Sequence, residues 1–307
     1  MSDFHSLTVA AVTQLTSNSV ALSFTIPASL KETFSFTAGQ YITIKHTINN
    51  KEVRRAYSIS SAPSEGDLTV GIKKVEGGAF STYANRYITA GDVLEVMPPE
   101  GRFVFTPGQG TKHIAAFAAG SGITPMMSIS KSVLTDDASN TFVLVYGNKS
   151  VEEAMFYDGI LEMKEAFPNR FFAQFVYSKA EENDALHGRI DASVVDFIVK
   201  DTFKNTAFDG FYLCGPEAMI NTVSDTLKNN GVNKELIHFE LFTASTTKVE
   251  TVTENVSGTA AVKVVVDDED FSFEMDKKEV ILDAILKKKI DAPYSCQGGV
   301  CSSCIAR

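Results

Sequence analysis

The sequence lacks several features that would place a protein in a membrane or on nucleic acid. It has no apolar run near the roughly 18 residues that a membrane helix needs. Residues 1–5 have neither the basic start nor the apolar core of a signal peptide. Basic residues are outnumbered, with 28 Lys and Arg against 38 Asp and Glu, and the net charge of −10 disfavours nucleic acid and anionic membranes as partners. We therefore expect a cytoplasmic protein.

Cysteine is scarce as well, with 4 among 307 residues. In a cytosolic chain, so few cysteines favour metal ligands or buried thiols over disulfides. Three of the four lie in the short segment 296–304 near the end of the sequence. Such clustering indicates a shared site rather than chance.

The pattern of residues changes along the chain, whose length suggests about two domains at roughly 150 residues per domain. Residues 1–106 form short alternating runs, which predict an antiparallel barrel or sandwich. Residues 107–242 alternate strands with helices, which predicts a parallel sheet. Residues 243–259, rich in Thr, Ser and Val, are predicted to be a linker. Residues 260–307 begin a further unit.

A first motif in the barrel region suits a ligand with phosphates and a flat ring. Arg55 can pair with a phosphate, the ring of Tyr57 can pack on an aromatic ligand, and Ser58 can donate a hydrogen bond. The alternative is an exposed arginine beside an ordinary strand tyrosine.

A second motif is a glycine turn that leads into a helix predicted at residues 83–88. Gly78, Ser81 and Thr82 would surround free backbone N–H groups at the helix start, where the helix dipole attracts an anion. The alternative is a plain glycine turn with Ser81 as the N-cap. Arg55 in the same barrel favours the anion site, because both features suit a pyrophosphate.

A third motif follows the first buried strand of the α/β region, predicted at residues 113–119. Gly120 and Gly122 form a turn that leads into a helix, with Thr124 as the expected N-cap and Pro125 at its first position. A doubly wound sheet holds nucleotide phosphates at this place. The full G-x-G-x-x-G spacing is not met.

The cysteines allow two further predictions. Cys214-Gly215-Pro216 ends a parallel strand, where a small thiol can lie against a nicotinamide; the alternative is a buried structural cysteine. Cys296, Cys301 and Cys304 are spaced C-x4-C-x2-C, as in the loop of a plant-type [2Fe–2S] ferredoxin. A zinc site is the competing interpretation, but it needs a fourth ligand and a second C-x2-C pair.

Together these motifs resemble the ferredoxin–NADP⁺ reductase superfamily, in the form with an appended C-terminal plant-type ferredoxin domain. Residues 36–41 match its F-x-x-G-Q-[YF] signature, and the resemblance covers essentially the whole chain. It implies a multidomain fold: an antiparallel β-barrel FAD domain, an α/β parallel-sheet NAD(P) domain and a partial β-grasp ferredoxin domain.

The resemblance also assigns roles to residues. FAD would be bound by Arg55, Tyr57, Ser58, Gly78, Ser81, Thr82 and Phe242, and NAD(P)H by Gly120, Gly122, Thr124, Pro125, Cys214, Gly215 and Pro216. The residues implied at the reacting flavin are Ser58, Cys214 and Glu240. The implied cluster ligands are Cys296, Cys301 and Cys304.

The implied activity is transfer of electrons from NAD(P)H through FAD and a [2Fe–2S] cluster to the oxygenase component of a multicomponent monooxygenase. The chain resembles the branch that serves phenylacetyl-CoA epoxidase. The alternatives are a reductase for a steroid or aromatic-ring hydroxylase, and a non-catalytic flavin- or zinc-binding fragment. Ser178 and Lys179 favour NADPH, although Glu181 and Glu182 favour NADH.

The resemblance requires a fourth cysteine about thirty residues after the third. Only 3 residues follow Cys304 (307 − 304 = 3). We therefore expect the chain to hold the N-terminal half of a truncated ferredoxin domain, and not to hold a stable [2Fe–2S] cluster on its own.

Overall fold

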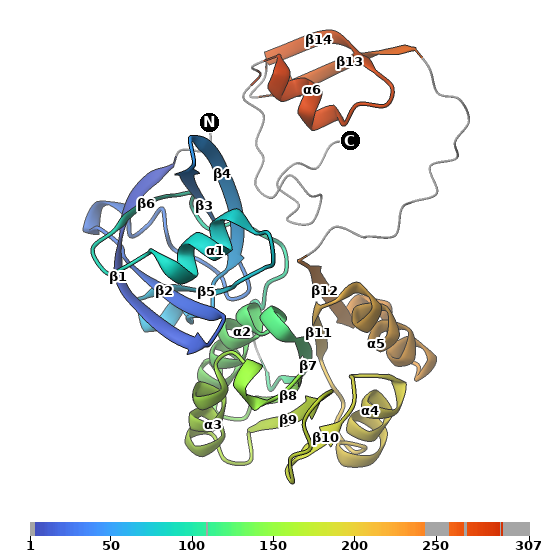
Figure 1. Cartoon of the computed structure of the whole chain (residues 1–307). Helices are drawn as coiled ribbons and strands as arrows, with labels where there is room; N and C mark the ends of the chain where they lie inside the picture. The colour runs from blue at the N-terminus through green and yellow to red at the C-terminus, as the bar shows by residue number, and fades with distance from the viewer. Residues whose placement is uncertain (1–3, 109, 243–257, 267–268, 289, 291–307) are drawn as a thin grey trace.

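The computed structural model describes residues 4–108, 110–242, 258–266, 269–288 and 290 (Figure 1). The first unit is an antiparallel six-stranded sheet in the order β4-β3-β6-β1-β2-β5. A bridge between Ile59 and Val70 joins its two edges and closes it into a barrel. Its strands are β1 (His5–Thr16), β2 (Ser19–Thr25), β3 (Tyr41–Ile48), β4 (Lys51–Ser58), β5 (Leu68–Lys73) and β6 (Val93–Val96). The predicted β-barrel is confirmed.

The barrel interior is filled by the apolar side of each alternating strand, as period-2 patterning requires. Leu22, Ile44 and Ile72 are fully buried in this core. The helix α1 (Ala79–Arg86) packs against it through Phe80 and Ala84. One end of α1 is thereby fixed close to strand β5.

The second unit is a six-stranded parallel sheet in the order β10-β9-β8-β7-β11-β12. Helices α2 and α3 cover one face and α4 and α5 the other (Figure 1). The strands are β7 (His113–Ala119), β8 (Thr141–Asn148), β9 (Phe171–Tyr177), β10 (Ala185–His187), β11 (Gly210–Gly215) and β12 (Ile237–Leu241). The helices are α2 (Ile123–Asp136), α3 (Tyr157–Ala166), α4 (Ala192–Asp196), which continues into a π-turn, and α5 (Glu217–Asn229).

The described part of the C-terminal segment is an antiparallel pair of strands and one helix. These are β13 (Thr259–Val266), β14 (Glu269–Asp276) and α6 (Ile281–Lys287). Ile285 and Ile290 pack together with Phe273. Most of the predicted linker, residues 243–257, lies outside the described residues.

Two helix starts differ from the sequence prediction. Helix α1 begins at Ala79 with Gly78 as its N-cap, so Ser81 and Thr82 lie inside its first turn. Helix α2 begins at Ile123, and the hydroxyl of Thr124 donates to the carbonyl of Ser121 instead of capping the helix.

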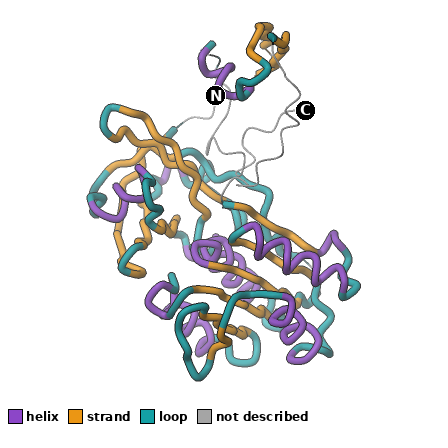
Figure 2. Tube along the Cα trace, turned by 45° about the vertical axis from the view of Figure 1, so that its right-hand side comes forward, coloured by secondary structure: helices purple, strands orange, loops and turns teal. Residues whose placement is uncertain are grey.

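The two large units are joined mainly by apolar burial. Phe103 and Phe105 follow the barrel in sequence, yet they are buried in the core of the α/β domain beside α2. The ring of Phe103 lies 5.4 Å from that of Tyr212, whose hydroxyl donates to the carbonyl of Val104 at 3.1 Å. In Figure 2 the strand-rich barrel lies next to the α/β domain, which carries most of the helices. Burial of each such ring contributes roughly 1.5–3 kcal/mol.

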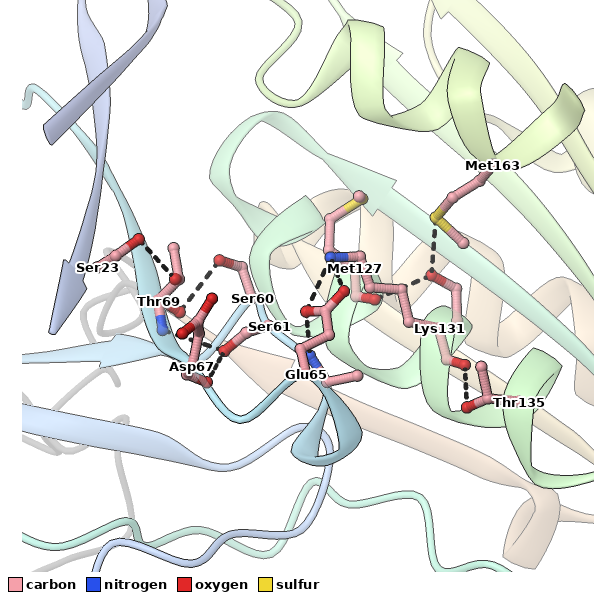
Figure 3. Close-up of polar contacts among 12 residues, drawn as sticks. Ser23, Ser60, Ser61, Glu65, Asp67, Thr69, Met127, Lys131, Thr135 and Met163 are labelled. Atoms are coloured by element: carbon pink, nitrogen blue, oxygen red, sulfur yellow. Dashed lines mark hydrogen bonds and ion pairs between the residues drawn. The ribbon is translucent and has the colours of Figure 1, made fainter. Parts of the chain in front are cut away.

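An ion pair adds a weaker link across the same boundary. The Nζ atom of Lys131 on α2 lies 2.8 Å from Oε1 of Glu65 in the barrel (Figure 3). The turn that carries Glu65 is held by Ser60 and Ser61, whose hydroxyls donate to the carbonyls of Thr69 and Asp67. Because both charged groups are partly exposed, the pair is worth about 0.2–1 kcal/mol.

We predict that Phe103→Ala lowers the free energy of unfolding by about 3–5 kcal/mol, because it opens a cavity where the two units meet. Phe239→Ala is the matched control, since Phe239 on β12 is 57% exposed and should cost about 1 kcal/mol or less. Urea denaturation followed by circular dichroism measures both. Equal losses in the two variants would contradict this account of the boundary.

Candidate active site

A cavity of about 460 Å³ lies between the barrel and the α/β domain. This volume is within the usual range for small-molecule and cofactor sites. Its walls come from β3, β4, β5 and α1 on one side, and from the start of α2 and the end of β12 on the other. Eight predicted site residues line it: Arg55, Tyr57, Ser58, Gly78, Ser81, Thr124, Glu240 and Phe242.

Strand β4 supplies the flat wall and one cation of the cavity. Arg55 and Tyr57 are two positions apart, so they share one face of the strand. The ring of Tyr57 is held 5.7 Å from that of Phe80 at the start of α1. Burial raises the pKa of Tyr57 despite the nearby charge of Arg55, so its phenol stays protonated and serves as a rigid, neutral wall.

The N-terminus of α1 opens on the same cavity. Its cap residue Gly78 lines the cavity, and the hydroxyl of Ser81 accepts the backbone N–H of Val75 at 3.1 Å, which closes the preceding turn. Arg55 and Lys73 also line this region, along with the acidic Glu76. A helix N-terminus beside two cations suits a pyrophosphate, and the aromatic wall suits a flavin ring. The residues present therefore fit FAD.

The segments predicted to bind the coenzyme lie at the carboxyl ends of the strands of the parallel sheet. The chain moves outward from β7 to β8, β9 and β10 and then returns to β11 on the other side of β7, which makes a topological switch point between β7 and β11. The turn Gly120–Gly122 follows β7, and Cys214-Gly215-Pro216 ends β11. A Cβ on Gly122 would lie 2.0 Å from the carbonyl oxygen of Cys214, so only glycine allows these two segments to meet.

This turn contributes to the cavity through Ser121 and Thr124. The other predicted coenzyme residues do not line the cavity. These are Gly120, Gly122, Pro125, Cys214, Gly215 and Pro216. Thr82 of α1, predicted to bind FAD, does not line it either.

The three residues predicted at the reacting flavin converge from three strands. Ser58 of β4 donates from its Oγ to Oε2 of Glu240 at 3.3 Å, although 182 positions separate them. Glu240 is paired in register with Cys214 on the adjacent strand. The thiol of Cys214 is fully buried and does not line the cavity. Burial raises its pKa well above the usual value, and the charge of Glu240 raises it further.

Several residues that line the cavity were not predicted. They include Gly71, Lys73 and Val75. Gly71 carries a signal that was available, because an isolated glycine inside a strand marks a close approach. A Cβ there would lie 2.7 Å from Cγ2 of Thr124, so the barrel could not approach the α/β domain as closely.

Cys296, Cys301 and Cys304 lie outside the described residues. Their role as cluster ligands, and the expectation that the chain holds no stable cluster, remain predictions.

Comparison with known proteins identifies the three units. Family models match an oxidoreductase FAD-binding domain at residues 6–105, an oxidoreductase NAD-binding domain at 117–225 and a 2Fe-2S iron-sulfur cluster binding domain at 264–307. The chain is 36% identical to one of the subunits of 1,2-phenylacetyl-CoA epoxidase from Escherichia coli (strain K12), over 99% of this chain and 86% of that protein. The chain belongs to the ferredoxin–NADP⁺ reductase family, in the branch with a C-terminal 2Fe-2S domain.

One further relative agrees with this assignment, and a solved structure has a similar fold. The reductase is 32% identical to the ferredoxin reductase component of 3-ketosteroid-9-alpha-monooxygenase from Rhodococcus rhodochrous, over 97% of this chain and 84% of that one. Its fold is similar to that of phthalate dioxygenase reductase, with a TM-score of 0.66 and 23% identity over 98% of this chain and 85% of that one.

The family makes the chain an NAD(P)H-dependent oxidoreductase with FAD, NAD(P) and 2Fe-2S domains, rather than a non-catalytic flavin- or zinc-binding fragment. In the described part of the chain, no helix is long and apolar enough to cross a membrane. The three matched segments do not test the domain limits at residues 106, 242 and 259, which remain predictions.

We predict that Cys214 in the folded reductase reacts with thiol reagents at least about tenfold more slowly than free cysteine at mildly alkaline pH. Only the thiolate is nucleophilic, and both burial and the charge of Glu240 disfavour it. Mass spectrometry of the tryptic peptide that contains Cys214 measures its labelling. The same protein in concentrated guanidinium chloride is the control and should label fully. Rapid labelling of the native protein would show that the thiol is accessible.

Proposed function

We propose that this reductase takes electrons from NADPH and passes them to the oxygenase component of a phenylacetyl-CoA epoxidase. The Ser58–Glu240 hydrogen bond is the observation that carries the site assignment, because it joins the FAD-binding barrel to the NAD-binding sheet across the wall of one cavity. The epoxidase is proposed from the relative in Escherichia coli, which matches nearly the whole chain.

In this proposal FAD is held by the barrel side of the cavity. Arg55 and the N-terminus of α1 bind its pyrophosphate, and Tyr57 packs against its ring system. The flavin, when bound, accepts a hydride from a nicotinamide and releases the two electrons singly. Leu241 and Phe242 at the end of β12 cover part of the cavity and reduce its access to water.

Ser58 and Glu240 would control protons at the reacting ring. The Ser58 hydroxyl carries a proton at the cavity wall, and its carboxylate partner accepts that proton in a hydrogen bond. The Cys214 thiol behind the wall stays neutral, so it would add no negative charge next to a bound flavin. The chain thus positions groups and sets electrostatics, while the cofactors supply the redox chemistry.

The preference for NADPH is proposed from the ends of β8 and β9. The backbone N–H of Lys179 donates to the carbonyl of Lys149 at 2.9 Å, so two exposed lysines lie on adjacent backbone segments at the carboxyl edge of the sheet. The Nζ of Lys149 lies 3.4 Å from Oε1 of Glu153, and Lys179 follows Ser178 directly. A lysine beside a serine hydroxyl suits the 2′-phosphate that distinguishes NADPH from NADH.

The function is tested with the purified reductase and FAD. We expect a yellow protein whose flavin is bleached by NADPH without oxygen, and which supports turnover of a purified phenylacetyl-CoA epoxidase oxygenase. If turnover occurs only with the oxygenase of a ketosteroid monooxygenase, the partner would instead be of the kind named for the Rhodococcus rhodochrous relative. Failure to bind FAD would overturn the assignment of the cavity.

We predict that Arg55→Ala weakens FAD affinity about tenfold or more, because one charge-assisted contact to phosphate is lost. Arg86→Ala is the matched control: Arg86 lies in the last turn of α1, at the opposite end from the cavity. Quenching of flavin fluorescence measures both dissociation constants. Equal losses would place the pyrophosphate elsewhere.

We also predict that Lys179→Ala lowers kcat/KM for NADPH about tenfold and changes it by less than about twofold for NADH, because one cation is removed from the 2′-phosphate site. Lys164→Ala, an exposed lysine of α3, should change neither value. Steady-state reduction of an artificial acceptor dye gives the rates. A wild-type preference for NADH would contradict the proposed coenzyme.

A further inference from the structure

Tyr146 carries a hydroxyl group inside the α/β core, where Asn148 and Tyr177 are also close to it. It lies on β8, next to Ala118 of β7, and its side chain is fully buried. Phe142 and Leu144, four and two positions earlier, point to the same face and belong to the same core. A phenylalanine would fill this space equally well, so the hydroxyl group calls for a separate explanation.

The hydroxyl of Tyr146 donates to the carbonyl oxygen of Gly120 at 2.9 Å. Gly120 is the first residue of the turn between β7 and α2, and its φ of 55° is in the left-handed region. A glycine turn of this kind has little intrinsic preference for one orientation of its peptide plane. The carbonyl of Gly120 also accepts the backbone N–H of Ile123, and the contact with Tyr146 adds a second hydrogen bond that holds the carbonyl toward the core.

The orientation of this carbonyl determines where the next N–H points. In a planar trans peptide, the C=O and N–H groups face opposite directions. Since the Gly120 carbonyl faces the core, the N–H of Ser121 faces away from it, on the side where Ser121 lines the cavity. The rest of the turn is fixed independently, by the packing of Gly122 on Cys214 and by the hydrogen bond from Thr124 to Ser121.

We propose that Tyr146 is a positioning residue for the coenzyme: its hydroxyl orients the Gly120–Ser121 peptide so that the turn presents its N–H to the pyrophosphate of NAD(P)H. The inference rests on the proposed role of the Gly120–Thr124 turn in coenzyme binding. Tyr146 itself touches neither coenzyme nor flavin, since it is fully buried and does not line the cavity. Burial raises the pKa of its phenol, which keeps the hydroxyl a donor across the working pH range.

The test is Tyr146→Phe in the FAD-loaded reductase. We expect KM for the coenzyme to rise about tenfold, which equals about 1.4 kcal/mol, with kcat at saturation changed by less than about twofold. FAD content should not change. Binding of ADP-ribose, which carries the pyrophosphate, should weaken in the same proportion when measured by calorimetry.

Tyr212→Phe is the matched control. It removes the same kind of bond, from a tyrosine hydroxyl to the carbonyl of Val104, at a place away from the turn. It should lower the melting temperature about as much as Tyr146→Phe and leave KM unchanged. Identical effects of the two variants on KM would overturn the inference, because the loss would then be one of general stability.

A third variant separates this inference from the proposed coenzyme site. Ser121→Asp places a negative charge at the cavity wall, beside the expected pyrophosphate. If it raises KM strongly while Tyr146→Phe has no effect, the turn binds coenzyme and the role of Tyr146 is wrong. If neither variant changes KM, the pyrophosphate is bound elsewhere and both proposals fall.

Discussion

The burial of Phe103 and Phe105 in the α/β core is the interaction on which the rest of the molecule depends. These residues belong to the segment that leaves the barrel, yet their rings complete the packing of the other domain. The apolar packing that forms the α/β core therefore also fixes the orientation of the barrel. The two domains are not joined by a separate, weak interface. Gly71 then allows β5 to lie directly against Thr124. A cavity with walls from both domains follows from this arrangement.

Electrostatics divides this cavity into two regions. Arg55, Lys73 and the N-terminus of α1 lie at one side, where Glu76 is also present and Lys73 is paired with Glu153. At the other side, the Ser58 hydroxyl donates to Glu240 at 3.3 Å, next to the neutral thiol of Cys214. The first region suits a bound anion, and the second suits the proposed exchange of protons and hydride.

The sequence predicted those parts of the fold whose pattern is contained in one continuous segment of the chain. The strand at residues 113–119 was predicted to the residue, because a continuous apolar run indicates burial directly. Strand β10 was missed, since three residues are too few to show a period. The start of α1 was placed four residues late, because hydroxyl residues were expected to mark it and glycine capped it instead.

The residues of the candidate site also fall into two groups, those that a local motif predicts and those that only the fold brings to the cavity. Motifs contained in one short segment, such as the residues around Arg55 and Gly78, could be recognised locally, and the family resemblance supplied Glu240. Lys73 could not be predicted, because it reaches the cavity only through the register of strands distant in sequence. The contact of Tyr146 with Gly120 joins positions 26 apart and has no sequence signature.

The end of β12 has a consequence for the kinetics of electron transfer. Leu241 and Phe242 form part of the cavity wall, and about twenty residues further along the same chain the 2Fe-2S domain match begins at residue 264. The cavity wall and the 2Fe-2S domain match thus belong to one polypeptide, 22 positions apart (264 − 242 = 22). Joining two modules by a short stretch of chain gives an effective concentration on the order of millimolar. An encounter between them is therefore intramolecular, and its frequency does not depend on how dilute the reductase is.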